Sequence, residues 1–139
     1  MEWAHKVKAA HQETHIIVSI STPRDRAARI ATNDKTLGIV RLWFHDLDRY
    51  VEECMADIKH ELFQPSQADM ILDLLDKHPD AELFVVHCDA GLSRSPAVAA
   101  AISKITTGED QEYFKRYHPN MLVYRTILER HQERQDGKG

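Results

Sequence analysis

Residues 83–95, LFVVHCDAGLSRS, constrain the fold of this chain more than any other stretch, because their two ends require opposite environments. Residues 83–86 are apolar and include two valines, as is typical of a short strand buried on both faces. Ser95 and Pro96 precede the alanine-rich residues 97–102. This order predicts a helix with Ser95 as its N-cap and Pro96 in its first position. A buried strand must therefore enter a helix through one short loop.

The connecting loop carries a cysteine, a glycine and an arginine, and we expect it to bind an anion. Backbone N–H groups and the positive end of the helix dipole converge where a loop meets a helix N-terminus. Gly91 permits the positive φ that a nest of amides needs, and Arg94 can clamp phosphate oxygens in a bidentate manner. The same field stabilises Cys88 as a thiolate, which is the nucleophilic form. These residues together favour phosphoryl transfer.

Residues 87–95 resemble the signature of the cysteine-dependent protein phosphatases, in the form found in dual-specificity members. Five residues separate the cysteine from the arginine, and further positions match. The resemblance implies that Cys88 attacks phosphorus to form a phosphocysteine and that Arg94 holds the equatorial oxygens. It also implies that the Ser95 hydroxyl supports the departing thiolate and that His87 orients the loop. The phosphate-binding residues that it implies are Asp89, Ala90, Gly91, Leu92, Ser93 and Arg94.

A phosphocysteine mechanism also needs an acid on a separate loop, whose conjugate base then activates the hydrolytic water. Residues 37–44 predict a second strand that runs directly into two aspartates, Asp46 and Asp48. In the resembled family the acid is an aspartate just after the strand that precedes the long helix before the cysteine loop. Asp46 matches this position best, and Asp48 is the alternative acid. The simpler alternative is that both are turn residues.

The remaining elements follow from hydrophobic spacing and from turn residues. A third strand is expected over residues 16–20. Asn120 is expected to cap the last helix. The buried stripe of the helix over 65–78 is expected to hold Met70, Ile71, Leu74 and Leu75. Helices are predicted over residues 1–13, 24–32, 50–62, 65–78, 95–107, 110–117 and 121–132.

This alternation of strands and helices predicts an α/β fold with a small central, mainly parallel sheet flanked by helices, as in the dual-specificity phosphatases. Asp46 and Cys88 both follow strand ends, and the carboxyl ends of strands are where such sheets bind ligands. We expect one domain over residues 1–134 and a frayed tail over 135–139. Cys54 is expected to pack, and a disulfide to Cys88 would require Cα atoms within about 7 Å.

Composition limits the partners and the compartment. The net charge of -4 and the pI near 6.1 argue against a general nucleic-acid surface. No apolar run has the length of a membrane span, and residues 1–6 do not resemble a signal peptide, so we expect no membrane partner. Two cysteines, one of them expected to be a free thiol, favour a cytoplasmic location. The histidines form no ligand pair beside a carboxylate, so we expect neither a metal nor an organic cofactor.

The sequence therefore predicts a protein phosphatase that hydrolyses phosphotyrosine monoesters, with phosphoserine and phosphothreonine as further candidates. Its expected partners are phosphorylated proteins or peptides, and phosphate or other oxyanions in the cysteine loop. Members of the resembled family that act on lipid phosphates tend to carry lysines in this loop, and positions 89, 90 and 92 carry no basic residue, so the resemblance disfavours phosphoinositides. Two alternatives remain open. One is a phosphate-binding module without turnover, and the other is a different cysteine-loop enzyme, such as an arsenate reductase or a rhodanese-like sulfur transferase.

Overall fold

A computed structural model of the chain describes residues 2–4, 13–47, 56–88 and 92–138. Its centre is a four-stranded parallel sheet with the strand order β1-β4-β2-β3. The prediction of a small α/β fold with a mainly parallel sheet is confirmed. The strands are β1 (Glu2–Ala4), β2 (His15–Ser21), β3 (Thr36–Trp43) and β4 (Leu83–His87).

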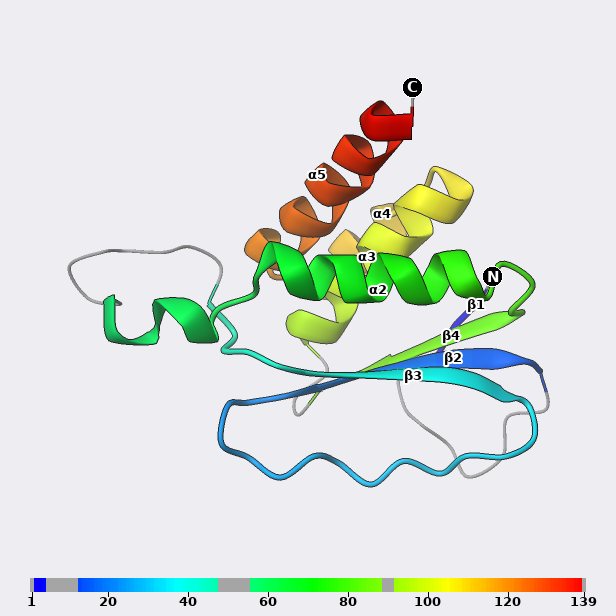
Figure 1. The fold of residues 1–139 in the computed structure, drawn as a ribbon, viewed down its shortest axis with the longest axis horizontal. Helices are drawn as coiled ribbons and strands as arrows, with labels where there is room; N and C mark the ends of the chain where they lie inside the picture. Colours follow the sequence, from blue (N-terminus) through cyan, green and yellow to red (C-terminus); the bar gives the residue numbers. More distant parts are fainter. Residues whose placement is uncertain (1, 5–12, 48–55, 89–91, 139) are drawn as a thin grey trace.

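The α-helices all lie on one side of the sheet in Figure 1, and the connection over residues 22–35 runs on the other side. Helix α5 packs against both α2 and α3. Among the described residues, no helix combines the length and the apolar character needed to cross a membrane. The helices are η1 (Ala56–Glu61, a 3-10 helix), α2 (Pro65–Lys77), α3 (Arg94–Thr107), α4 (Gln111–Arg116) and α5 (Met121–Lys138).

The core has two unequal layers, one on each face of the sheet. On the helix side, alternate residues of β2 and β4, such as Ile16 and Phe84, join the buried faces of α2, α3 and α5 in one cluster. On the other side, Ile17 and Val85 form a smaller cluster that Ile30 of the 22–35 connection partly covers. Because both faces are buried, residues 16–18 of β2 and residues 83–86 of β4 are continuous apolar runs, as is typical of strands covered on both sides.

The predicted helix over residues 24–32 is wrong, because this segment contains no helix. Side chains of β3 bind its backbone instead: Arg41 Nη1 donates to the Ala28 carbonyl at 2.9 Å, and Trp43 Nε1 donates to the Asp25 carbonyl at 3.2 Å. Arg24 has a φ of 72°, which a right-handed helix does not contain. Contacts with β3 therefore replace the hydrogen bonds that a short helix would supply.

Both ends of the chain also differ from the expectation. Residues 2–4 pair with β4 instead of beginning a helix, because sheet pairing avoids the cost of nucleating an isolated helix. Helix α5 continues through Lys138, beyond residue 132 and into the segment 135–139 for which we expected fraying. Arg134 supports this extension through ion pairs of 2.9 and 2.8 Å to aspartates of α2.

Two middle helices are confirmed in part. In α2, Met70 is 45% exposed, so it does not belong to the buried stripe, whereas Leu72 is buried. Of the predicted helix over 50–62, the described part is the 3-10 helix η1, which has no buried residue. Residues 48–55, which include Cys54 and Asp48, lie outside the described residues.

Gly38 sets the distance between β3 and α2. A Cβ atom added at this position would lie 2.7 Å from Leu74 Cδ1 and 3.0 Å from His78 Nε2. Because real Cβ atoms essentially never approach so closely, any side chain here would force Leu74 and His78 to shift.

We expect Gly38→Ala to lower the free energy of unfolding by about 1 kcal/mol, since the ends of two side chains must shift. Gly137→Ala in α5 is the matched control, because its Cβ would have no atom within 4 Å. Urea denaturation should place this control at or slightly above the wild type. Equal stability of the two variants would contradict close packing at Gly38.

Candidate active site

Cys88 directly follows β4 and is half-buried against the start of α3. Two groups of Ser95 contact its sulfur. The Ser95 backbone N–H donates to Cys88 Sγ at 3.4 Å, and the thiol bonds the Ser95 hydroxyl oxygen at 3.3 Å. The hydroxyl can reverse its role and donate to a thiolate. The sulfur is thus held at a helix N-terminus by two groups that can stabilise its negative charge.

The start of α3 differs from the sequence-based prediction. Ser93 is the N-cap, with no side-chain capping bond, so the expected N-cap role of Ser95 is wrong. Ser95 is the second helical residue, fully buried against Cys88, and Pro96 is the third. Pro96 is accommodated because N–H groups of the first turn lack intrahelical partners. The Ser95 hydroxyl, which the sequence predicts to cap the helix, therefore contacts the Cys88 sulfur instead.

Arg94 is 6% exposed and ties α3 to the ends of two strands. Its Nη1 atom donates to the Phe44 carbonyl at 2.9 Å and to Thr22 Oγ1 at 3.2 Å. Phe44 follows β3, and Thr22 follows β2. A buried guanidinium is costly unless its N–H groups are bonded, and these contacts fix its position. They place a positive charge beside the loop that begins at Cys88.

Asp46 lies at the same end of the sheet and contacts the cysteine loop directly. Its Oδ1 atom accepts hydrogen bonds from Ser93 Oγ and from Asn120 Nδ2, each at 2.8 Å. The Asp46 residue is exposed to solvent. Because Ser93 is the residue before Arg94, the candidate acid and the candidate phosphate loop are joined by one hydrogen bond.

Asn120 does more than the sequence indicates. Its predicted capping role is confirmed, because Oδ1 accepts the Val123 N–H at 3.1 Å. The residue is 3% exposed, and its own backbone N–H donates to the Ser93 carbonyl at 3.0 Å. Its amide nitrogen bonds Asp46, which is 74 residues away in sequence. Only the helix-start pattern at residues 118–120 points to Asn120, and it gives no sign of this long-range contact.

Glu61 is a further residue of the site that the sequence does not single out. It lies at the end of η1 and bonds both His45 and Arg24. Hydrogen bonds from Arg24 and then from His45 lower the pKa of Glu61 below its ordinary value of 4.5, so the group is a carboxylate at neutral pH. His45, the residue before Asp46, is therefore held by the negatively charged side chain of Glu61.

The structure brings together Asp46, Ser93, Arg94, Ser95 and Cys88, which come from the ends of β3 and β4 and the start of α3. His87 is the last residue of β4 and is half-buried. Leu92 is 59% exposed. Among the described residues, no three histidine, cysteine or acidic side chains are placed to hold a metal. The predicted site residues that lie outside the described residues are Asp48, Asp89, Ala90 and Gly91.

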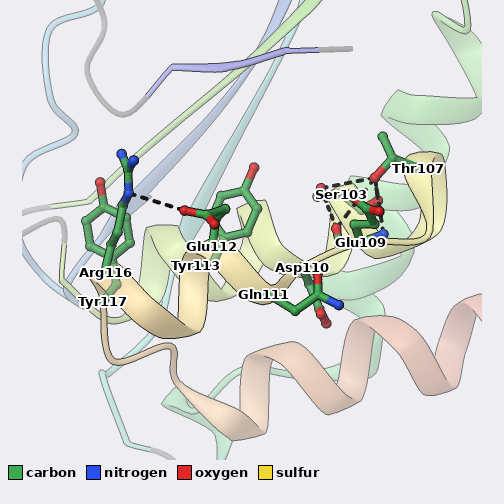
Figure 2. Close-up of a pocket in the computed structure, with 9 residues that line it drawn as sticks. All are labelled: Ser103, Thr107, Glu109, Asp110, Gln111, Glu112, Tyr113, Arg116 and Tyr117. Atoms are coloured by element: carbon green, nitrogen blue, oxygen red, sulfur yellow. Dashed lines mark hydrogen bonds and ion pairs between the residues drawn. The ribbon is translucent and has the colours of Figure 1, made fainter.

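A groove of about 320 Å³ lies apart from this site, between the end of α3 and helix α4 (Figure 2). At its rim Asp110 accepts a hydrogen bond from the hydroxyl of Tyr124. Burial, and then this bond, raise the pKa of Tyr124 to about 12. The lining residues are Ser103, Thr107, Glu109, Asp110, Gln111, Glu112, Tyr113, Arg116 and Tyr117, so no described residue of the candidate active site lines the groove.

Comparison with known proteins finds similarity only at the level of structure. No model of a known protein family matches the sequence, and no curated protein matches it. The structure of PTPMT1 in complex with PI(5)P aligns with a TM-score of 0.54 and 13% identity, over 91% of this chain and 81% of that chain. The predicted fold of the cysteine-dependent tyrosine and dual-specificity phosphatases is thereby confirmed.

Two human structures align at lower scores. The tyrosine phosphatase-like serine/threonine/tyrosine-interacting protein has a TM-score of 0.49 and 19% identity, over 88% of this chain and 79% of that chain. DUSP28 has a TM-score of 0.45 and 14% identity, over 90% of this chain and 81% of that chain.

Two substitutions separate the roles of Asn120. Asn120→Ala removes both the cap and the bond to Asp46, and we expect it to lower the free energy of unfolding by about 1–2 kcal/mol. Asn120→Ser keeps a capping hydroxyl but is too short to reach Asp46. Urea denaturation should therefore show that serine recovers about 1 kcal/mol relative to alanine. Equal losses for the two variants would contradict the capping role.

Proposed function

We propose that this protein hydrolyses phosphomonoesters on phosphorylated proteins or peptides through a phosphocysteine intermediate. One observation carries the proposal. Cys88 Sγ is bonded by Ser95 at the start of α3, while Asp46, from the end of a different strand, is bonded to Ser93 of the same loop. A nucleophile and an acid, each supplied by its own segment, are what phosphoryl transfer through cysteine requires.

In the first half of the proposed reaction, Cys88 Sγ attacks phosphorus and the ester P–O bond breaks. Arg94 and the backbone amides of the loop bind the equatorial oxygens, where charge accumulates. The leaving oxygen takes a proton from Asp46. Ser93 and Asn120 both donate their hydrogen bonds to Oδ1 of Asp46, and no described residue bonds Oδ2. Oδ2 is therefore available to carry that proton.

In the second half, the Asp46 carboxylate takes a proton from water, and the resulting hydroxyl group attacks phosphorus. The S–P bond breaks, phosphate leaves, and the electron pair returns to Cys88. The Ser95 hydroxyl, 3.3 Å from the sulfur, donates to the departing thiolate. This cycle requires a reduced thiol, and we therefore propose that the protein works in the cytoplasm.

Phosphotyrosine in proteins is the proposed substrate, with phosphoserine and phosphothreonine as further candidates. PTPMT1 was crystallised with a phosphoinositide, but at 13% identity the likeness extends only to the fold. The exposed Leu92 and the sequence neighbours Asp89 and Ala90 add no positive charge to the loop. An inositol ring with several phosphates lacks cationic partners at these positions, and this supports peptide substrates.

The pH dependence of aryl phosphate hydrolysis tests the proposal. The wild-type rate should follow a bell-shaped dependence on pH, because the thiolate must be formed and the acid must be protonated. Asp46→Ala should lower kcat by about 10²-fold or more and remove the basic limb. Cys88→Ser should abolish turnover. If Asp48→Ala removes the basic limb instead, Asp48 is the acid.

The alternatives give different outcomes. A wild-type protein that binds vanadate or inorganic phosphate but never turns over would be a phosphate-binding module, and the enzyme proposal would fail. Thiol-dependent reduction of arsenate without phosphatase activity would identify a cysteine-loop reductase. Comparing a phosphotyrosine peptide with a soluble phosphoinositide under the same conditions then decides between the two substrate classes.

A further inference from the structure

His45 lies in the sequence between Phe44 and Asp46, which both bond residues at the start of α3. Its predecessor Phe44 accepts the hydrogen bond from Arg94, and its successor is Asp46. Glu61 contacts His45 twice. The His45 backbone N–H donates to the Glu61 carbonyl at 2.9 Å, and the His45 ring Nε2 lies 2.9 Å from Glu61 Oε2. Main chain and side chain of His45 are thus both fixed by one residue.

The same carboxylate also holds the neighbouring loop. Its other oxygen, Oε1, accepts a hydrogen bond from Arg24 Nη1. Arg24 lies two residues after Thr22, which accepts a hydrogen bond from Arg94. The Glu61 side chain is 16% exposed and that of His45 is 23% exposed, so water competes only in part for their contact. Glu61 therefore links the segment after β2 to the segment after β3.

These contacts complete a series along residues 43–46, in which each residue is bonded by a segment outside β3. Gln67 Nε2 of α2 donates to the Trp43 carbonyl at 3.1 Å. Arg94 fixes the Phe44 carbonyl, and Glu61 fixes His45. The Asp46 side chain bonds Ser93 of the cysteine loop and Asn120, the residue that caps α5. His45, which directly precedes Asp46, is thus fixed through both its backbone and its ring.

We propose that Glu61 is a positioning residue that acts through His45 to hold Asp46 where it protonates the leaving oxygen. This inference rests on the proposed function, in which Asp46 is the acid. The Glu61 side chain bonds Arg24 and His45 and not Cys88 or Arg94, so loss of its carboxylate should leave both of those residues in place. Its effect should therefore fall on proton transfer to the leaving group, and binding of the phosphoryl group should not change.

Two substrates whose leaving groups differ in basicity can distinguish an effect on proton transfer from an effect on the other steps of the reaction. Phenolate is a poor leaving group and needs the acid, whereas 4-nitrophenolate departs without a proton. We expect Glu61→Gln to lower kcat/KM, which reports the steps up to phosphocysteine formation, by about tenfold for phenyl phosphate and by less than about twofold for 4-nitrophenyl phosphate. Asp46→Ala gives the largest ratio of the two losses. Inhibition by vanadate should match the wild type.

Glu112→Gln is the matched control, because Glu112 also faces two basic side chains, Lys115 and Arg116, but lies in α4 away from the site. It should leave both rates unchanged. His45→Ala is the second variant. It removes the ring contact but keeps the backbone bond to the Glu61 carbonyl, and it should shift the ratio in the same direction. If Glu61 acts through His45, adding Glu61→Gln to His45→Ala should change the ratio little further.

Equal losses for the two substrates would overturn the inference and make Glu61 a structural residue only. Additive effects in the double variant would show that Glu61 does not act through His45. Should Glu61→Gln fail to fold, an unchanged ratio in His45→Ala overturns the inference by itself. Failure of the proposed function looks different, because wild type and Cys88→Ser would then be equally inactive, and the inference would fail with it.

Discussion

The buried guanidinium of Arg94 is the contact on which the rest of the site depends. Its bonds to the Phe44 carbonyl and to Thr22 tie the start of α3 to the ends of β3 and β2. A parallel sheet brings the carboxyl ends of its strands to one edge, so a single side chain reaches both segments. Because the arginine is charged and 6% exposed, it fixes these segments firmly and also supplies the positive charge that an oxyanion needs.

Long-range hydrogen bonds then assemble the remaining groups around this anchor. Asp46 meets Ser93 and Asn120 through a single oxygen, so α5 helps to place the candidate acid although no residue of α5 need touch a substrate. Glu61 does the same from η1, through His45. The candidate acid is therefore placed by residues outside the phosphate loop. Substitutions at these supporting positions should change the proposed reaction although they do not alter the loop itself.

The sequence predicts the fold well where local pattern and burial agree. Strands β2 and β4 follow from continuous apolar runs, and β3 follows from a mostly apolar segment. Gly108, with a φ of 84°, ends α3 as expected. Local pattern gives wrong predictions where a residue distant in sequence forms the hydrogen bonds. Side chains of β3 bind the backbone of residues 24–32, where a helix is predicted, and the sulfur of Cys88 contacts the Ser95 hydroxyl that is predicted to cap α3. Glu61 carries no signal of its own, because its role depends on residues that only the fold brings near.

The most direct test of the central claim is to trap the phosphocysteine. Asp46→Ala is suited to this, because 4-nitrophenolate leaves without an acid whereas water is no longer activated, so the intermediate should accumulate. After rapid acid quench and digestion, mass spectrometry should find one phosphoryl group on the peptide that contains Cys88, and none in the variant that also carries Cys88→Ser. Turnover of the wild type with no adduct in Asp46→Ala, or with the phosphoryl group on another residue such as Cys54, would contradict the account.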